Sequence, residues 1–119
     1  MQSALADTAV VVIAALHFWF LALEMFFWDK PLGLRTFGMS AEEAALTKPL
    51  AMNQGLYNGF LAAGLLWGVA AAGDAVILFF LGCVVVAGVF GALTASRKIL
   101  WVQAVPGLIA LLLVLLRPG

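Results

Sequence analysis

Hydrophobic residues form four long runs, and short segments between the runs hold most of the charged residues. An α-helix needs about 20 such residues to cross roughly 30 Å of hydrocarbon. The runs reach that length and predict transmembrane helices at residues 8–28, 50–72, 75–95 and 99–117. We therefore expect an all-α membrane protein, in which residues 1–119 form one integral membrane domain with the fold of a compact antiparallel four-helix bundle.

The connections between the runs indicate how the helices follow one another. Residues 72–74 and 96–98 are short enough to be tight turns, which make consecutive helices antiparallel neighbours. The long connection, residues 29–49, contains two prolines and half of the charged residues, so it is not a span. Within it, Ser40 and Glu43 match a capping box. We expect a short amphipathic surface helix over residues 41–48, lying along the membrane.

Composition also favours a lipid environment. The chain is 66% hydrophobic and 10% charged, with a mean hydropathy of +1.15. A soluble domain of this size could not cover so much apolar surface with so few charged side chains. Basic and acidic residues balance and are scattered, which excludes nucleic acid as a partner. The single Cys83 is interpreted as a small packing residue.

Basic residues predict the orientation. The first run is too long for a signal peptide and no Lys or Arg precedes it, so we expect it to remain as a helix. Cytoplasmic loops carry an excess of basic residues. With four crossings, five basic residues share one side: Lys30, Arg35, Lys48, Arg97 and Lys98. This predicts a multi-pass membrane protein with both termini outside the cytoplasm.

Polar side chains within the runs are candidates for a site, because each costs free energy in hydrocarbon unless another group satisfies it. His17 and Glu24 are seven residues apart and share one helix face. The second run carries amides and a phenol in pairs spaced by four residues. Together with one amide of the fourth run, the candidate ligand-binding residues are His17, Glu24, Asn53, Gln54, Tyr57, Asn58 and Gln103.

These candidates lie at the midplane or in the predicted cytoplasmic half of their helices, so one polar cavity reachable from the cytoplasm would satisfy them together. Pro106 leaves the carbonyl of Val102 without its usual donor, which adds an acceptor beside the cavity. On the second helix, Gly55-xxx-Gly59 and Gly64-xxx-Gly68 point in nearly opposite directions. They predict close helix packing on two sides.

Each candidate also has a structural interpretation. Amides hydrogen-bond across membrane helices without any ligand, at roughly 0.6–2 kcal/mol per pair, and Tyr57 suits an interfacial anchor. Glu24 could pair with a basic residue of the 29–49 connection, and His17 could donate to a backbone carbonyl. Intramembrane ionisable groups are rare, which favours a function for His17 and Glu24. One histidine and one such carboxylate are too few to indicate a metal or haem site, and the sequence identifies no cofactor.

Four segments resemble a known family. They are residues 17–28 (HFWFLALEMFFW), 37–38 (FG), 51–64 (AMNQGLYNGFLAAG) and 98–106 (KILWVQAVP). The chain resembles the small bacterial integral membrane proteins grouped as domain of unknown function 1304 (DUF1304). The resemblance spans nearly the whole chain and implies a compact four-helix membrane protein. It implies no activity.

Three function classes follow. The first is a protein that binds a small molecule or lipid, with proton-coupled transport in which Glu24 exchanges a proton for a small cationic or polar ligand. The second is a membrane enzyme for a lipid-like substrate, with His17 and Glu24 as the catalytic acid and base. The third is an accessory subunit of a larger membrane complex. Membrane lipids are expected partners in all three, and a homo-oligomer remains open.

Overall fold

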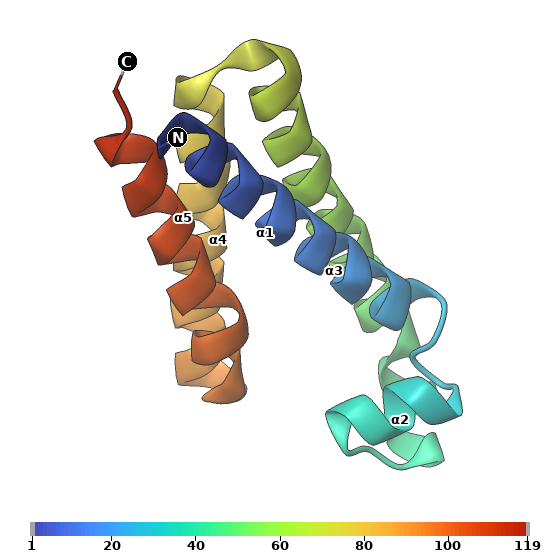
Figure 1. Ribbon diagram of the computed structural model, residues 1–119. Coiled ribbons are helices and arrows are strands. Elements are labelled where there is room, and N and C mark those ends of the chain that lie inside the picture. The colour runs from blue at the N-terminus through green and yellow to red at the C-terminus, as the bar shows by residue number, and fades with distance from the viewer. Residues whose placement is uncertain (1, 119) are drawn as a thin grey trace. The chain divides into compact units, whose positions relative to one another are not determined.

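The computed structural model describes residues 2–118, and every regular element in this range is helical (Figure 1). The elements are α1 (Gln2–Met25), α2 (Pro31–Phe37), α3 (Ala41–Trp67), the π-helix η1 (Gly68–Ala72), α4 (Asp74–Thr94), the π-helix η2 (Leu100–Ala104) and α5 (Val105–Leu116). The predicted all-α class is confirmed.

Three stretches of helix are long and apolar enough to cross a membrane. They are Ser3–Met25, Ala41–Ala72 and Asp74–Thr94. A fourth apolar helix, Leu100–Leu116, is shorter and corresponds to the predicted span at 99–117. The helix predicted at 75–95 differs from α4 by one residue at each end.

The bounds of α1 require a correction, since the prediction placed this helix at 8–28. Residues 2–7 include no glycine or proline, and the helix extends back through them; the Thr8 hydroxyl donates to the carbonyl of Ala4 at 2.7 Å. At the other end the chain leaves the helix after Met25. The following turn leads into α2, which begins with Pro31 and ends at Phe37. The residue that caps its end, Gly38, has the left-handed conformation (φ 62°).

The predicted surface helix at 41–48 is not a separate element. The capping box forms as expected, because the Glu43 amide donates to Ser40 Oγ and the Ser40 amide donates to Glu43 Oε1. The helix it starts continues through Pro49 into the predicted second span. Proline removes only one helical hydrogen bond, and side chains just before it bind residues 28 and 29. The short helix between the first two long ones is therefore α2, at Pro31–Phe37.

Those side-chain bonds belong to a compact unit formed by Ala15–Ala62. Trp28 Nε1 donates to Thr47 Oγ1 at 3.0 Å, and Lys48 Nζ donates to Asp29 Oδ2 at 3.0 Å. The bond from Lys48 holds the pKa of Asp29 below its usual range. This stabilisation is present at neutral pH and is lost as the pH falls through the lowered pKa.

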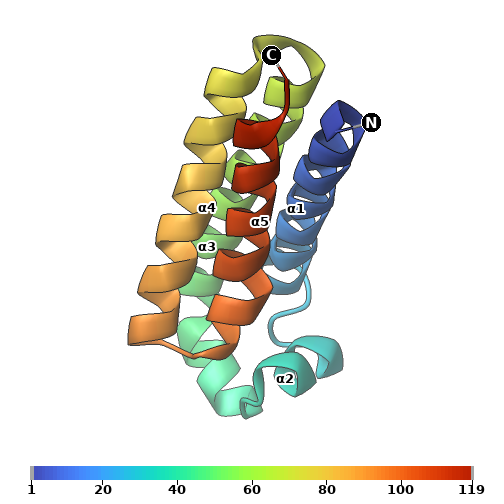
Figure 2. The same cartoon turned by 60° about the vertical axis from the view of Figure 1, so that its left-hand side comes forward.

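The other compact unit comprises residues 2–14 and 63–118. Here α4 lies side by side with α5 and η2 (Figures 1 and 2). A Cβ on Gly88 would collide with the backbone of Ala104, and one on Gly107 would lie 2.8 Å from Val84 Cγ1. Glycine is required at both positions because the two helices approach so closely.

A π-helical turn precedes Pro106 in this unit. The Val105 amide donates to the carbonyl of Leu100, five residues back rather than four. Proline lacks an amide hydrogen and crowds the preceding turn, and a π turn is one way for a helix to accommodate that break. The missing hydrogen bond predicted at Pro106 is thus accompanied by a local widening of the helix, and the helix does not end there.

Charges gather at one end of this unit, in what we call the Arg117 cluster: Asp7, Asp74 and Arg117. The guanidinium contacts both carboxylates, with Nη1 2.6 Å from Asp7 Oδ1, and also donates to the carbonyl of Ser3. Its side chain is 9% exposed, whereas those of Asp7 and Asp74 are 43% and 49% exposed. The bonds to Asp74 and Asp7 raise the pKa of Arg117 further above its usual value. The cluster ties the first residues of α1 and α4 to the end of α5.

Replacing Arg117 tests the contribution of this cluster. Arg117→Gln leaves two carboxylates at one end of the unit without their cation, so we expect the Tm of the purified protein to fall by several degrees. The exposed Arg97 forms none of the ion pairs between described residues, so Arg97→Gln is the matched control and should leave the Tm unchanged. Equal Tm values for the two variants would show that the cluster does not stabilise the fold.

Candidate functional site

The contact of interest joins two of the candidate residues in the unit Ala15–Ala62. Asn58 Nδ2 donates a hydrogen bond to Glu24 Oε1, with 2.5 Å between the two atoms. Asn58 is 4% exposed and Glu24 is half-buried. Both residues lie within apolar helices long enough to cross a membrane. A carboxyl group and an amide thus meet between α1 and α3.

Two glycines of α3 make this contact possible. A Cβ on Gly55 would lie 2.6 Å from Met25 Cγ, 3.2 Å from Glu24 Cβ and 3.3 Å from the carbonyl oxygen of Leu21. A Cβ on Gly59 would lie 2.7 Å from Leu21 Cδ1. The predicted Gly55-xxx-Gly59 surface therefore receives α1 at the turn that carries Glu24.

The second glycine pair of this helix has a different neighbour. A Cβ on Gly64 would overlap the ring of Phe80, and one on Gly68 would lie 2.6 Å from Ile77 Cγ1. Both contacts are with α4. The glycine spacing predicted that this helix packs closely on two sides. The contacts of Gly55 and Gly59 with α1, and of Gly64 and Gly68 with α4, agree with that prediction.

Glu24 takes part in no ion pair between residues 2–118. Lys48, one of the predicted alternatives, bonds to Asp29. The remaining pairs of the described chain join Arg117 to Asp7 and Asp74. The structural interpretation in which a loop cation neutralises Glu24 therefore has no support from these contacts.

His17 is fully enclosed by its neighbours in the fold. It is 0% exposed, and its ring meets that of Phe20 edge-on with centroids 5.2 Å apart. It also takes part in a further interaction, so the residue has another partner. A histidine enclosed in this way is held in place by packing, which favours the structural interpretation of this residue.

The remaining candidates of α3 are not grouped with Glu24. Asn53 and Gln54 are exposed, and Tyr57 is 52% exposed, with its ring 6.1 Å from that of Phe60. At about 100° per residue, Tyr57 lies almost opposite Gly55 on the helix. Its phenol therefore faces away from the contact with α1.

Gln103 lies in the other compact unit, within η2. It is half-buried and has an interaction partner. Of the seven candidate residues, the described hydrogen bonds thus bring together two, Glu24 and Asn58. A cavity shared by all seven remains a prediction.

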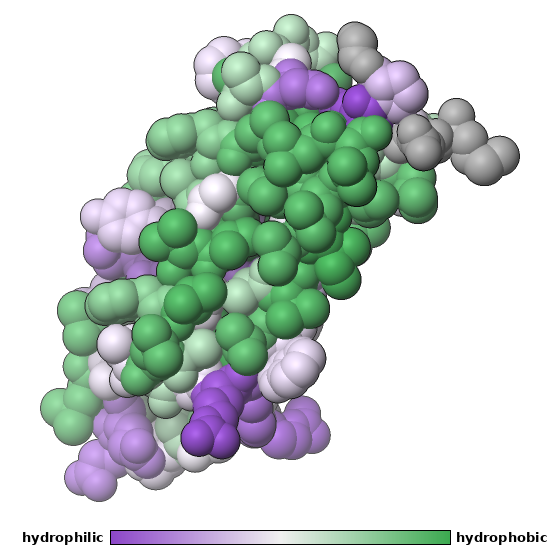
Figure 3. Space-filling model, turned by 90° about the vertical axis from the view of Figure 1, so that its left-hand side faces the viewer, coloured by the Kyte–Doolittle hydropathy of each residue, from purple (hydrophilic) through white to green (hydrophobic). Residues whose placement is uncertain are grey.

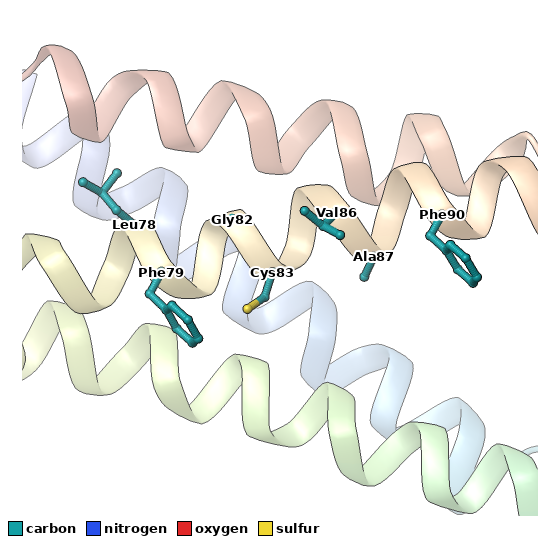
Figure 4. Close-up of a pocket in the computed structure, with 7 residues that line it drawn as sticks. All are labelled: Leu78, Phe79, Gly82, Cys83, Val86, Ala87 and Phe90. Carbon is teal, nitrogen blue, oxygen red and sulfur yellow. The ribbon is translucent and has the colours of Figure 1, made fainter.

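An open pocket lies elsewhere, along one side of α4 (Figure 4). Its lining residues are apolar except for one thiol: Leu78, Phe79, Gly82, Cys83, Val86, Ala87 and Phe90. None of them is a candidate from the sequence. A lining of this kind suits hydrocarbon and offers no group for acid or base chemistry, so the carboxyl–amide contact is the better candidate for a functional site.

Comparison with known proteins gives one family and one relative. The sequence model of a family described as "Protein of unknown function (DUF1304)" matches residues 11–115. The "Uncharacterized protein YpaA" of Lactococcus lactis subsp. lactis (strain IL1403) is 27% identical over 106 residues, covering 86% of this chain and 89% of that protein. No solved structure matches the chain. The matched range includes Glu24 and Asn58.

The close approach at Gly55 generates a stability prediction. Gly55→Ala forces Met25 and Glu24 away from α3, and overpacking of this kind costs about 1–3 kcal/mol. The control is Gly82→Ala, because a Cβ on Gly82 meets nothing within 4 Å. That change should be neutral or stabilising by about 0.5–1 kcal/mol through helix propensity alone. Free energies of unfolding in detergent measure both, and a stabilising Gly55→Ala would contradict the packing described here.

Proposed function

The chain belongs to the DUF1304 family of proteins of unknown function, and we propose that it is a multi-pass membrane protein with an ion- or ligand-binding site at Glu24. Four crossings, the bacterial inner membrane and proton-coupled binding of a small cation are parts of this proposal. The observation that carries it is the hydrogen bond from Asn58 to Glu24 within apolar helices.

Surface composition supports the membrane part of the proposal. Hydrophobic side chains cover most of the face shown in Figure 3. Large apolar residues are widely exposed along α4, among them Val86 at 70% and Phe90 at 66%. In water such a surface would drive aggregation, whereas lipid chains solvate it. The apolar pocket of α4 fits the same environment.

The chemistry of the site supports the binding part. An ionised carboxylate in a low-dielectric region is costly unless a positive charge or several donors compensate it. Asn58 supplies a neutral donor, and no ion pair of the described chain supplies a charge. Such a carboxyl group is stable when it holds a proton or when a cation binds beside it. Exchange between these two states is the reaction we assign to the site.

The exchange between a protonated and a cation-bound carboxyl group indicates that the ligand is a cation. A protonated amine or another organic cation replaces the proton without creating net charge in the apolar region. A neutral polar molecule or an anion offers no such compensation. The enzyme alternative needs His17 to reach a substrate, and its complete burial does not favour that. The site is therefore better suited to binding and transport than to acid–base catalysis.

Proton release on cation binding tests the site. Tetraphenylphosphonium added to the purified wild-type protein in weak buffer should release up to one proton per chain, measured with a pH electrode. Glu24→Gln should abolish the release. Glu42→Gln, which alters an exposed acid, should leave it intact. Asn58→Leu keeps the carboxyl group but removes its donor, so affinity should fall roughly tenfold or more. Undiminished release from Glu24→Gln would refute the proposal.

Orientation is tested separately. An alkaline phosphatase fused after the C-terminus should be active, and a fluorescent protein in the same place should be dark, because both termini are proposed to lie outside the cytoplasm. Fusions truncated after Gly38, in the basic connection, should give the opposite pattern. A fluorescent C-terminal fusion would place the termini inside and reverse the side from which Glu24 is reached.

A further inference from the structure

The helix formed by α3 and η1 is longer than a membrane requires. Its 32 residues, Ala41–Ala72, exceed the roughly 20 that a membrane-spanning helix needs. Hydrocarbon is about 30 Å thick, and a helix tilted by as much as 40° crosses it with roughly 26 residues. Part of this helix must therefore lie beyond the hydrocarbon if the chain crosses a membrane.

Charge identifies the part that lies outside. Residues 41–50 contain Glu42, Glu43 and Lys48, whereas residues 59–72 contain no charged side chain. At a more ordinary tilt of about 20°, roughly 21 residues cross the hydrocarbon, so about 11 of the 32 residues lie outside it. The first turns of α3 then lie at the depth of the headgroups.

Residues 26–30 and α2 fold against these turns and not away from them. Trp28 links the two parts, since its ring meets Phe37 with centroids 4.8 Å apart and its Nε1 donates to Thr47. The ion pair between Lys48 and Asp29 adds a second link. We call residues 26–50 the interfacial segment. It is an ordered structure and not a free loop.

The surface of this segment is unusually apolar for a region in water. Phe26 is 63% exposed, Phe37 44%, Leu46 79% and Leu50 73%. Exposed apolar residues that share one short segment with charged residues are typical of segments that lie in the membrane interface. Water alone would leave this surface poorly solvated.

Two basic side chains of the segment take part in no ion pair of the described chain. Lys30 and Arg35 are both exposed, whereas Lys48 is compensated by Asp29. Phosphate groups are the anions present at headgroup depth, and ammonium and guanidinium groups bind them through charge-assisted hydrogen bonds.

We propose that the interfacial segment binds phospholipid within the headgroup layer of one leaflet. Phe37 and Leu46 contact the upper acyl chains, and Lys30 and Arg35 bind lipid phosphates. This inference rests on the proposed membrane crossing and assigns a partner to a surface that the site at Glu24 does not use.

Depth measurements by spin labelling test the placement. In a Cys83→Ala background, nitroxides are attached at Phe37→Cys, Leu46→Cys, Glu42→Cys and Val86→Cys, and each protein is reconstituted into phosphatidylcholine–phosphatidylglycerol vesicles. Collision rates with oxygen, which enters lipid, and with a nickel chelate, which stays in water, give the depth. We expect labels at 37 and 46 to favour oxygen, the label at 86 to favour it most strongly, and the label at 42 to favour the chelate.

The label at 86 separates two kinds of failure. If it favours the chelate, α4 is not in hydrocarbon and the proposed membrane crossing fails. If it favours oxygen while the labels at 37 and 46 are as accessible to the chelate as that at 42, the crossing stands and the interfacial placement is overturned.

A charge variant tests the phosphate contacts. Lys30→Gln combined with Arg35→Gln should weaken phosphatidylglycerol binding to the purified protein roughly 30-fold, which corresponds to about 1 kcal/mol for each basic residue. Lys30→Arg combined with Arg35→Lys keeps both charges and should bind as the wild type does. Titration with this lipid, followed by native mass spectrometry, measures both. Equal affinity for the Gln variant and the wild type would overturn the assignment.

Discussion

The approach of α1 to α3 at Gly55 and Gly59 determines what the polar side chains of this region can do. With any larger residue at these positions, Leu21, Glu24 and Met25 would have to move outward. The absence of a side chain at Gly55 and Gly59 is what lets the two helices come this close. Because of that, Glu24 meets Asn58 directly, and the carboxyl group has a fixed partner whose own amide is buried.

The acidic side chains of the described chain differ in how they are compensated. Arg117 forms ion pairs with Asp7 and Asp74, and Lys48 forms one with Asp29. Glu43 completes the capping box at Ser40, and Glu42 is exposed. Glu24 has a neutral amide. Glu24 is therefore the acid whose hydrogen-bond partner is a buried, neutral amide and not a cation.

Much of this arrangement follows from the sequence. Apolar runs locate the helices, because length and hydropathy are local properties. The spacing of Gly55, Gly59, Gly64 and Gly68 predicts two packing surfaces, and the contacts with α1 and α4 agree. The capping box at Ser40 is equally local and forms with both of its bonds. Features that depend on neighbours in sequence, or on one helix face, are those that pattern analysis predicts well.

Other features depend on contacts between distant residues. Pro49 reads as a break, yet the helix continues through it, with Thr47 and Lys48 bonded to residues 28 and 29 just before it. Helical spacing, through the pairs 53/57 and 54/58, predicted one polar stripe of Asn53, Gln54, Tyr57 and Asn58. A neighbouring helix, however, covers only part of a helix surface. Asn58 lies within that part and Tyr57 does not. Helical periodicity predicts the face of the helix on which a side chain lies. It does not predict which face packs against another helix.

Cation binding at Glu24 requires a carboxyl group that is stable both when protonated and when ionised. Comparison with the carboxylates paired with Arg117 shows why Glu24 meets this requirement. A carboxylate paired with a guanidinium is held charged, and a proton or ligand cation would have to displace an internal cation first. Asn58 fixes the position of Glu24 without fixing its charge, because an amide can donate to the ionised form and accept from the protonated one. Asn58 can therefore hydrogen-bond to both the ionised and the protonated form of Glu24. A neutral partner in a tightly packed apolar region is the arrangement that proton and cation exchange needs.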